Sequence, residues 1–66
     1  MPQAVILKFR SYEEPTDLTQ RLEVKAIDVA TDLPVASLPP AQMALWLRQE
    51  GYQWRLGSSG IWERAA

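Results

Sequence analysis

The chain has 66 residues, of which 47% are hydrophobic and 23% are charged, and its formal net charge is −1. This length and composition predict one small globular domain over residues 1–66 and argue against a disordered chain. The sequence contains no cysteine and no histidine, which excludes disulfides and the usual zinc, iron and copper ligand sets.

The N-terminal stretch MPQAVILKFR has no basic region ahead of its short apolar run, so we do not expect a signal peptide. No apolar run approaches the roughly 20 residues that a membrane span requires. We therefore expect a cytoplasmic protein without a membrane partner. Residues 4–10 are rich in β-branched and aromatic side chains, which predicts a strand with Val5, Leu7 and Phe9 on one face.

The next segment, residues 11–20, predicts a polar connection around Pro15. Residues 21–31 alternate in hydrophobicity until Ala26 and then shift phase, which predicts a second strand with a β-bulge near Ala26. A helix over residues 18–33 is the alternative, with Leu18, Leu22, Ala26, Val29 and Leu33 on one face, but the β-branched side chains favour the strand. The sequence TDLP then predicts a turn, and PVASL (34–38) a short third strand.

Residues 40–50 form the clearest predicted element, a helix that is entered through two prolines and ends at Gly51, with Ser37 as the candidate cap. On a helical wheel its broad apolar face contains Met43, Ala44, Leu47, Ala41 and Leu45, with Arg48 toward the edge. Trp46 falls outside this face, among polar residues. The wheel therefore predicts that the Trp46 indole lies at the surface.

The last predicted element is a hairpin in which GSSG (57–60) joins two strands. With Leu56 opposite Ile61, one face contains Tyr52, Trp54, Leu56, Ile61 and Glu63, and the other contains Gln53, Arg55, Trp62 and Arg64. This register predicts Trp54 in the core and Trp62 among arginines on the surface.

Together these elements predict an α+β fold in the order β-β-β-α-β-β, with one helix packed on one face of an antiparallel sheet and a C-terminal hairpin. The first two strands carry apolar side chains on both faces, whereas one short helix covers only one side of a sheet. We therefore expect the sheet either to curl into a barrel or to bury its second face against another copy of the chain.

The sequence contains few residues of the types that most often act in catalytic sites. Without histidine or cysteine, the candidate acid–base groups are carboxylate pairs such as Glu13–Glu14 and Asp28–Asp32, which are more typical of turns. A domain of this size also has little room for a pocket that excludes water. We therefore expect no catalysis, no cofactor and no metal site.

Aromatic residues and arginines gather in the last third of the chain, and the candidate binding residues are Trp46, Arg55, Trp62 and Arg64. Tryptophan and arginine dominate the hot spots of protein interfaces. We therefore expect a non-catalytic accessory or regulatory domain that docks on a larger protein partner, either as a monomer or as a homodimer.

Two alternatives stay open. The same aromatic and arginine residues suit a single-stranded nucleic-acid-binding module, in which bases stack on exposed rings, although the net charge gives it few cations. Residues 4–10 would also accept a partner's strand if they lay at a sheet edge, where Lys8 and Arg10 would limit indiscriminate pairing.

Overall fold

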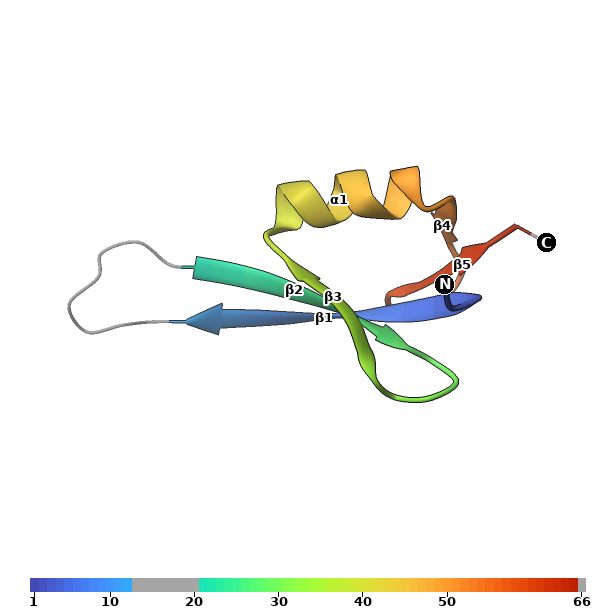
Figure 1. Ribbon diagram of the computed structural model, residues 1–66, viewed down its shortest axis with the longest axis horizontal. Helices are drawn as coiled ribbons and strands as arrows, with labels where there is room; N and C mark the ends of the chain where they lie inside the picture. Colours follow the sequence, from blue (N-terminus) through green and yellow to red (C-terminus); the bar gives the residue numbers. More distant parts are fainter. Residues whose placement is uncertain (13–20, 66) are drawn as a thin grey trace.

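The computed structural model describes residues 1–12 and 21–65, and within them one helix lies on one face of a five-stranded antiparallel sheet (Figure 1). The strands are β1 (Ala4–Tyr12), β2 (Arg21–Asp28), β3 (Pro34–Leu38), β4 (Tyr52–Trp54) and β5 (Ile61–Arg64), and the helix is α1 (Pro40–Gln49). The predicted α+β class and element order are confirmed. The predicted connection around Pro15, with Glu13 and Glu14, lies outside the described residues. Within the described part of the chain, no helix has the length and apolarity that crossing a membrane requires.

The central strand of the sheet is β1, and the strand order is β3-β2-β1-β5-β4. On one side β1 pairs with β2 from Val5 opposite Asp28 to Tyr12 opposite Arg21. On the other side it pairs with β5 only from Ala4 to Ile6. The two sides of β1 are therefore unequally covered, because β2 is twice as long as β5.

The second strand has the predicted irregularity, since its pairing with β3 shifts register between Ala26 and Ile27. Its pairing with β1 continues without interruption at the same place. Ala26 is therefore buried beneath the helix, while Ile27 lies on the opposite face of the sheet. The helical alternative for this segment is wrong.

The core lies between α1 and the sheet. Its buried side chains are Val5, Val24, Ala26, Met43, Leu47 and Tyr52. Met43 and Leu47 are four residues apart and so share one face of the helix. The apolar face of the helix is narrower than the wheel predicts, because Ala41 and Ala44 are exposed and Leu45 is 56% exposed.

The ends of α1 follow the prolines and glycine of the sequence, with one correction. Pro39 occupies the N-cap position without a side-chain cap, and proline fills the first turn as predicted. Ser37 is not the cap, because it lies in β3 and its hydroxyl donates to Glu23. After the helix, Gly51 has a φ of 79°, a left-handed conformation that ends a helix readily.

The C-terminal hairpin has a different register from the predicted one. Gln53 lies opposite Glu63 and Trp54 opposite Trp62, and the amide of Arg55 donates to the carbonyl of Ile61 at 2.8 Å. Arg55 therefore takes the place opposite Ile61 that the sequence assigned to Leu56. A slip of one residue turns every side chain of a strand to the other face, so the predicted faces of the hairpin are wrong.

The face of the sheet away from α1 carries a row of three isoleucines. Ile6 of β1 lies opposite Ile27 of β2 and also opposite Ile61 of β5, and all three side chains are partly buried. The sheet has β3 and β4 at its two edges, so the described strands do not close into the predicted barrel. Apolar side chains therefore lie on both faces of the sheet, although Lys8 and Lys25 share the face away from α1 with the isoleucines.

Candidate functional site

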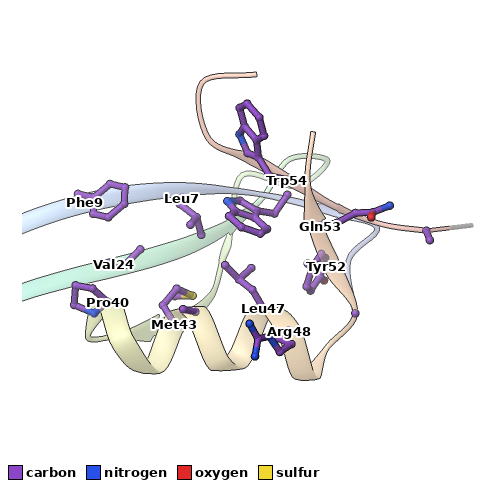
Figure 2. A pocket seen from close by; sticks show the side chains of 14 residues that line it. Leu7, Phe9, Val24, Pro40, Met43, Leu47, Arg48, Tyr52, Gln53 and Trp54 are labelled. Atoms are coloured by element: carbon purple, nitrogen blue, oxygen red, sulfur yellow. The ribbon is translucent and has the colours of Figure 1, made fainter. Parts of the chain in front are cut away.

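A groove of about 560 Å³ opens between α1 and the sheet (Figure 2). Its floor is formed by Leu7, Phe9 and Val24, its helix side by Met43 and Leu47, and its hairpin side by Trp54 and Trp62. Arg48 is the one charged side chain among the described residues that line it. A concave, largely apolar site with few polar groups is typical of ligand-binding surfaces.

Among the described strands, the groove lies beside the part of β1 that β5 does not reach. The side chains of Val5, Leu7 and Phe9 alternate onto the face that carries the helix, as the sequence predicts. Val5 is buried and lies beside Trp62, whereas Phe9 lies beyond the end of β5 and is 70% exposed. A phenylalanine at this position leaves a large apolar surface in contact with water.

The two tryptophans of the hairpin have exchanged their expected places. Trp62 lies on the helix side of the sheet, partly buried and packed against the core, instead of on an arginine-flanked surface. Trp54, which the sequence places in the core, is 47% exposed at the border of the groove. The change at Trp62 follows from the register of the hairpin, which places Trp62 directly opposite Trp54 and on the same face. Trp54 keeps its predicted face, but it is exposed at the end of the edge strand β4.

The two predicted arginines make ion pairs away from the groove. Arg55 lies on the opposite face of the hairpin, where its Nη2 atom is 2.8 Å from Oε2 of Glu63. Arg64 donates from Nε to the carbonyl of Glu50 at 2.9 Å, and its guanidinium group lies 5.4 Å from the ring centre of Tyr52. Arg64 thus joins the end of the helix to the hairpin.

Trp46 also has a structural place. Its ring stacks on Tyr52, with ring centres 5.6 Å apart and an angle of 24° between the planes, and it packs against the core while partly buried. Of the four predicted site residues, the structure therefore places only Trp62 in the groove. Trp46 and Arg64 surround Tyr52, and Arg55 lies on the other face.

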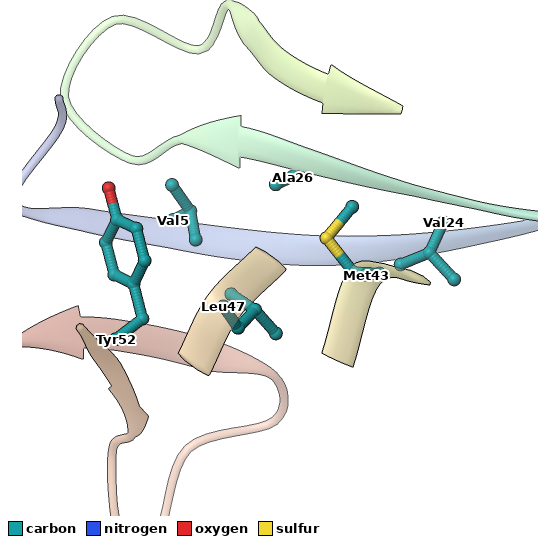
Figure 3. Packing of buried hydrophobic residues seen from close by; sticks show 6 residues of the cluster. All are labelled: Val5, Val24, Ala26, Met43, Leu47 and Tyr52. Carbon is teal, nitrogen blue, oxygen red and sulfur yellow. The ribbon is translucent and has the colours of Figure 1, made fainter. Parts of the chain in front are cut away.

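Tyr52 fixes the end of the groove that lies nearest the chain termini. Figure 3 shows it at one end of the row of buried side chains, with Val24 at the other. Its hydroxyl donates to the carbonyl of Pro2 at 2.5 Å. Burial raises the pKa of the Tyr52 hydroxyl. The nearby Arg64 opposes this increase, while the carboxylates of Glu50 and Asp28 add to it. A neutral phenol therefore ties β4 to the N-terminal residues.

Sequence reasoning missed three groove residues, namely Phe9, Arg48 and Trp54. Phe9 was placed on the correct face of its strand, but no local signal shows that β5 ends before reaching it. Arg48 was placed at the edge of the apolar face of the helix, which is where it lies beside the groove. Trp54 was placed on the correct face of its strand, but no local signal shows that β4 is an edge strand that leaves this ring exposed.

The groove is a concave surface lined mainly by apolar side chains. Its lining includes no carboxylate, and the described residues contain no group of three or more acidic side chains arranged to hold a metal ion. Comparisons with protein-family models, curated proteins and solved structures give no match for this chain. The groove itself is therefore the basis on which a function is assigned.

Proposed function

We propose that this protein is a non-catalytic, cytoplasmic accessory or regulatory domain that docks on a larger protein partner through the groove between α1 and the sheet. The observation that carries the proposal is the pair of exposed aromatic rings, Phe9 and Trp54, on either side of a partly buried Trp62. Aromatic side chains beside a well-formed apolar pocket are the residues that dominate the binding energy of protein interfaces.

The expected contribution of these rings is substantial. Burying a large apolar side chain fully is worth about 1.5–3 kcal/mol relative to leaving it in water. Phe9 and Trp54 are each partly covered already, so together they supply a few kcal/mol, which is about the size of a hot spot. Arg48 adds a cation at the border of the groove, where it favours a partner that carries a carboxylate.

Single-stranded nucleic acid is the alternative ligand, since bases stack on exposed tryptophan and phenylalanine rings. Binding to a nucleic-acid backbone depends on several cations that neutralise phosphates. Here Arg55 and Arg64 are paired with Glu63 and Glu50, which leaves Arg48 as the cation of the groove lining. This distribution of charge favours a protein partner.

A peptide-display selection tests the proposal. A random peptide library is selected on the wild-type protein, and the enriched peptides are titrated by fluorescence anisotropy against three proteins: wild type, Trp54→Ala and Leu45→Ser. Leu45 is a matched control, because it is an exposed apolar residue on the outer side of the helix and does not line the groove.

We expect enriched peptides to bind wild type and Leu45→Ser equally, and to bind Trp54→Ala about tenfold more weakly. Equal affinity for all three proteins would show that the groove is not the docking surface. Binding of mixed-sequence oligonucleotides that weakens steeply with added salt, together with no peptide enrichment, would favour the nucleic-acid alternative.

A further inference from the structure

The unequal pairing of β1 leaves part of its backbone without a partner among the described residues. On the β2 side, pairing continues to Tyr12. On the β5 side, the last backbone hydrogen bond is donated by the Leu7 amide to the carbonyl of Gly60, at 3.0 Å. Beyond Leu7, no described strand lies beside β1 on that side.

The hydrogen bonds of β1 show which groups are unpaired. Ala4 accepts from the amide of Val29 on the β2 side, whereas Gln3 accepts from Arg64 and Leu7 donates to Gly60 on the β5 side. In a strand this direction alternates from residue to residue. Phe9 and Ser11 therefore direct their N–H and C=O groups toward the side on which no described strand pairs with them, next to the groove.

An added strand would occupy this position in line with β5. Residues 8–12 of β1 span about 17 Å at roughly 3.4 Å per residue, which is the length of an ordinary strand. A residue of the added strand that lies opposite Phe9 would direct its side chain to the helix side of the sheet. Figure 2 shows that Phe9 borders the groove on that side, so this side chain would enter it.

The charged residues beside this edge favour one kind of side chain at alternate positions of the added strand. Lys8 and Lys25 lie directly opposite each other in the β1–β2 pair, on the face away from the helix. Like charges in this arrangement are unfavourable, and an acidic residue in the added strand opposite Lys8 would relieve them. A second β1 would instead bring another Lys8 to the same face of the sheet, so a copy of this chain is the poorer occupant.

We propose that the partner contributes one extended segment, with apolar and acidic residues alternating, that pairs antiparallel with β1 beside Phe9 and Ser11. This inference rests on the proposed function and specifies how the groove is used. Apolar side chains of the segment fill the groove, and its carboxylates lie near Lys8 on the opposite face. Backbone pairing provides affinity and the alternate side chains provide specificity.

The geometry makes a specific prediction about backbone methylation. In an antiparallel ladder, the residues opposite Phe9 and Ser11 exchange hydrogen bonds with them, while the residues opposite Lys8 direct their amides away. The probe is a labelled eight-residue peptide of alternating valine and glutamate. We expect methylation of the valine amides to weaken binding by about tenfold or more, and methylation of the glutamate amides to leave it unchanged.

A charge reversal provides the matched protein variant. Lys8 is exposed, and Lys8→Glu would place an acid opposite Lys25, which preserves the fold. We expect this variant to bind the valine–glutamate peptide about tenfold more weakly and to prefer a valine–lysine peptide of the same length. Amide exchange at Phe9 and Ser11 should slow when the valine–glutamate peptide binds the wild-type protein.

The outcomes separate this inference from the proposed function. If display peptides require Trp54 but valine methylation has no effect and exchange at Phe9 and Ser11 is unchanged, strand addition is wrong and the groove still binds. If no peptide binds the groove, both are wrong. If these two amides become protected as protein concentration rises without peptide, the occupant is a second copy and the inference is overturned.

Discussion

Trp54 and Trp62 face each other across the hairpin but are buried to different degrees. Trp62 packs against the core and lies beside Val5, whereas Trp54 extends to the border of the groove and is the more exposed of the two. Their substitutions should therefore separate stability from binding.

We expect Trp62→Ala to lower the free energy of unfolding by about 2–4 kcal/mol, because it removes a partly buried ring and leaves a cavity. Trp54→Ala should lower it by less than about 1 kcal/mol while weakening peptide binding. Urea unfolding followed by far-ultraviolet circular dichroism measures both changes. An equal loss of stability in the two variants would contradict the burial that distinguishes them.

We expect the ionisation of Tyr52 to limit the stability of the protein at alkaline pH. Burial raises the pKa of its hydroxyl, with Glu50 and Asp28 acting in the same direction and Arg64 opposing them. The folded state therefore favours the neutral phenol. Its contribution to stability is complete below the unfolded pKa of about 10 and is lost as the pH rises through the higher folded pKa.

We expect the melting temperature of the wild-type protein to fall more steeply above pH 10 than that of Tyr52→Phe. At neutral pH the variant should be less stable by about 0.5–1.5 kcal/mol, because the hydrogen bond to Pro2 is lost. Melting curves collected between neutral and strongly alkaline pH make the comparison. Parallel curves for the two proteins would show that Tyr52 does not set the limit.

The hairpin loop determines where β5 stops pairing with β1. The hydroxyl of Ser58 donates to the carbonyl of Arg55 at 2.7 Å and accepts from the amide of Ile61 at 3.1 Å. The carbonyl of Gly60 then accepts the last backbone hydrogen bond, which the amide of Leu7 donates. Gly60 has a φ of 128°, a backbone conformation that L-residues rarely adopt. Beyond this glycine, no described residue pairs with this edge of β1.

We expect Gly60→Ala to destabilise the protein by about 1–3 kcal/mol, because the strained backbone conformation remains whatever space surrounds it. Gly57→Ala should cost less, about 1–2 kcal/mol, since its φ of 81° lies near the left-handed helical region and a Cβ there meets no neighbour. Chemical unfolding of both variants gives the comparison. A larger loss at Gly57 would contradict the role assigned to Gly60.

The elements were predictable where local signals agree. Two prolines and a glycine bracket α1, the alternation of residues 4–10 places Val5, Leu7 and Phe9 on one face of β1, and the phase shift near Ala26 marks an irregular strand. Each of these signals involves only a few neighbouring residues, so it does not depend on how distant strands pair. The order of the elements in the chain follows directly from them.

The candidate site was predictable only in part, because it depends on pairing between distant strands. The GSSG sequence suggests a loop that begins after Leu56, but the Ser58 hydrogen bonds and the Arg55–Ile61 pairing begin it one residue earlier. That single step turns Trp62 onto the face that carries Trp54 and the helix. The unpaired edge beside Phe9 depends on the different lengths of β2 and β5, which no local pattern reveals.

At the scale of the whole molecule, the described residues place apolar side chains on both faces of the sheet and one helix over one of these faces. Ile6, Ile27 and Ile61 form a row across β2, β1 and β5 on the face away from α1. A domain of this length buries only about 60% of the surface of its unfolded chain, so covering this row with a second copy would add stability. Self-association stays a prediction, separate from the groove on the other face.

We expect sedimentation experiments to show a reversible dimer at high protein concentration, and Ile6→Thr to shift it toward the monomer without loss of strand propensity. Trp54→Ala, on the opposite face, should leave the association constant unchanged. A wild-type protein that stays monomeric from micromolar to millimolar concentration would contradict this expectation.

The most direct test of the groove as the docking surface is an amide and indole NMR titration of the wild-type protein with an enriched display peptide. We predict shifts at Leu7, Phe9, Arg48 and the indoles of Trp54 and Trp62, with Ile6 and Ile27 unaffected. Shifts confined to the isoleucine row, or no shifts at saturating peptide, would contradict the assignment.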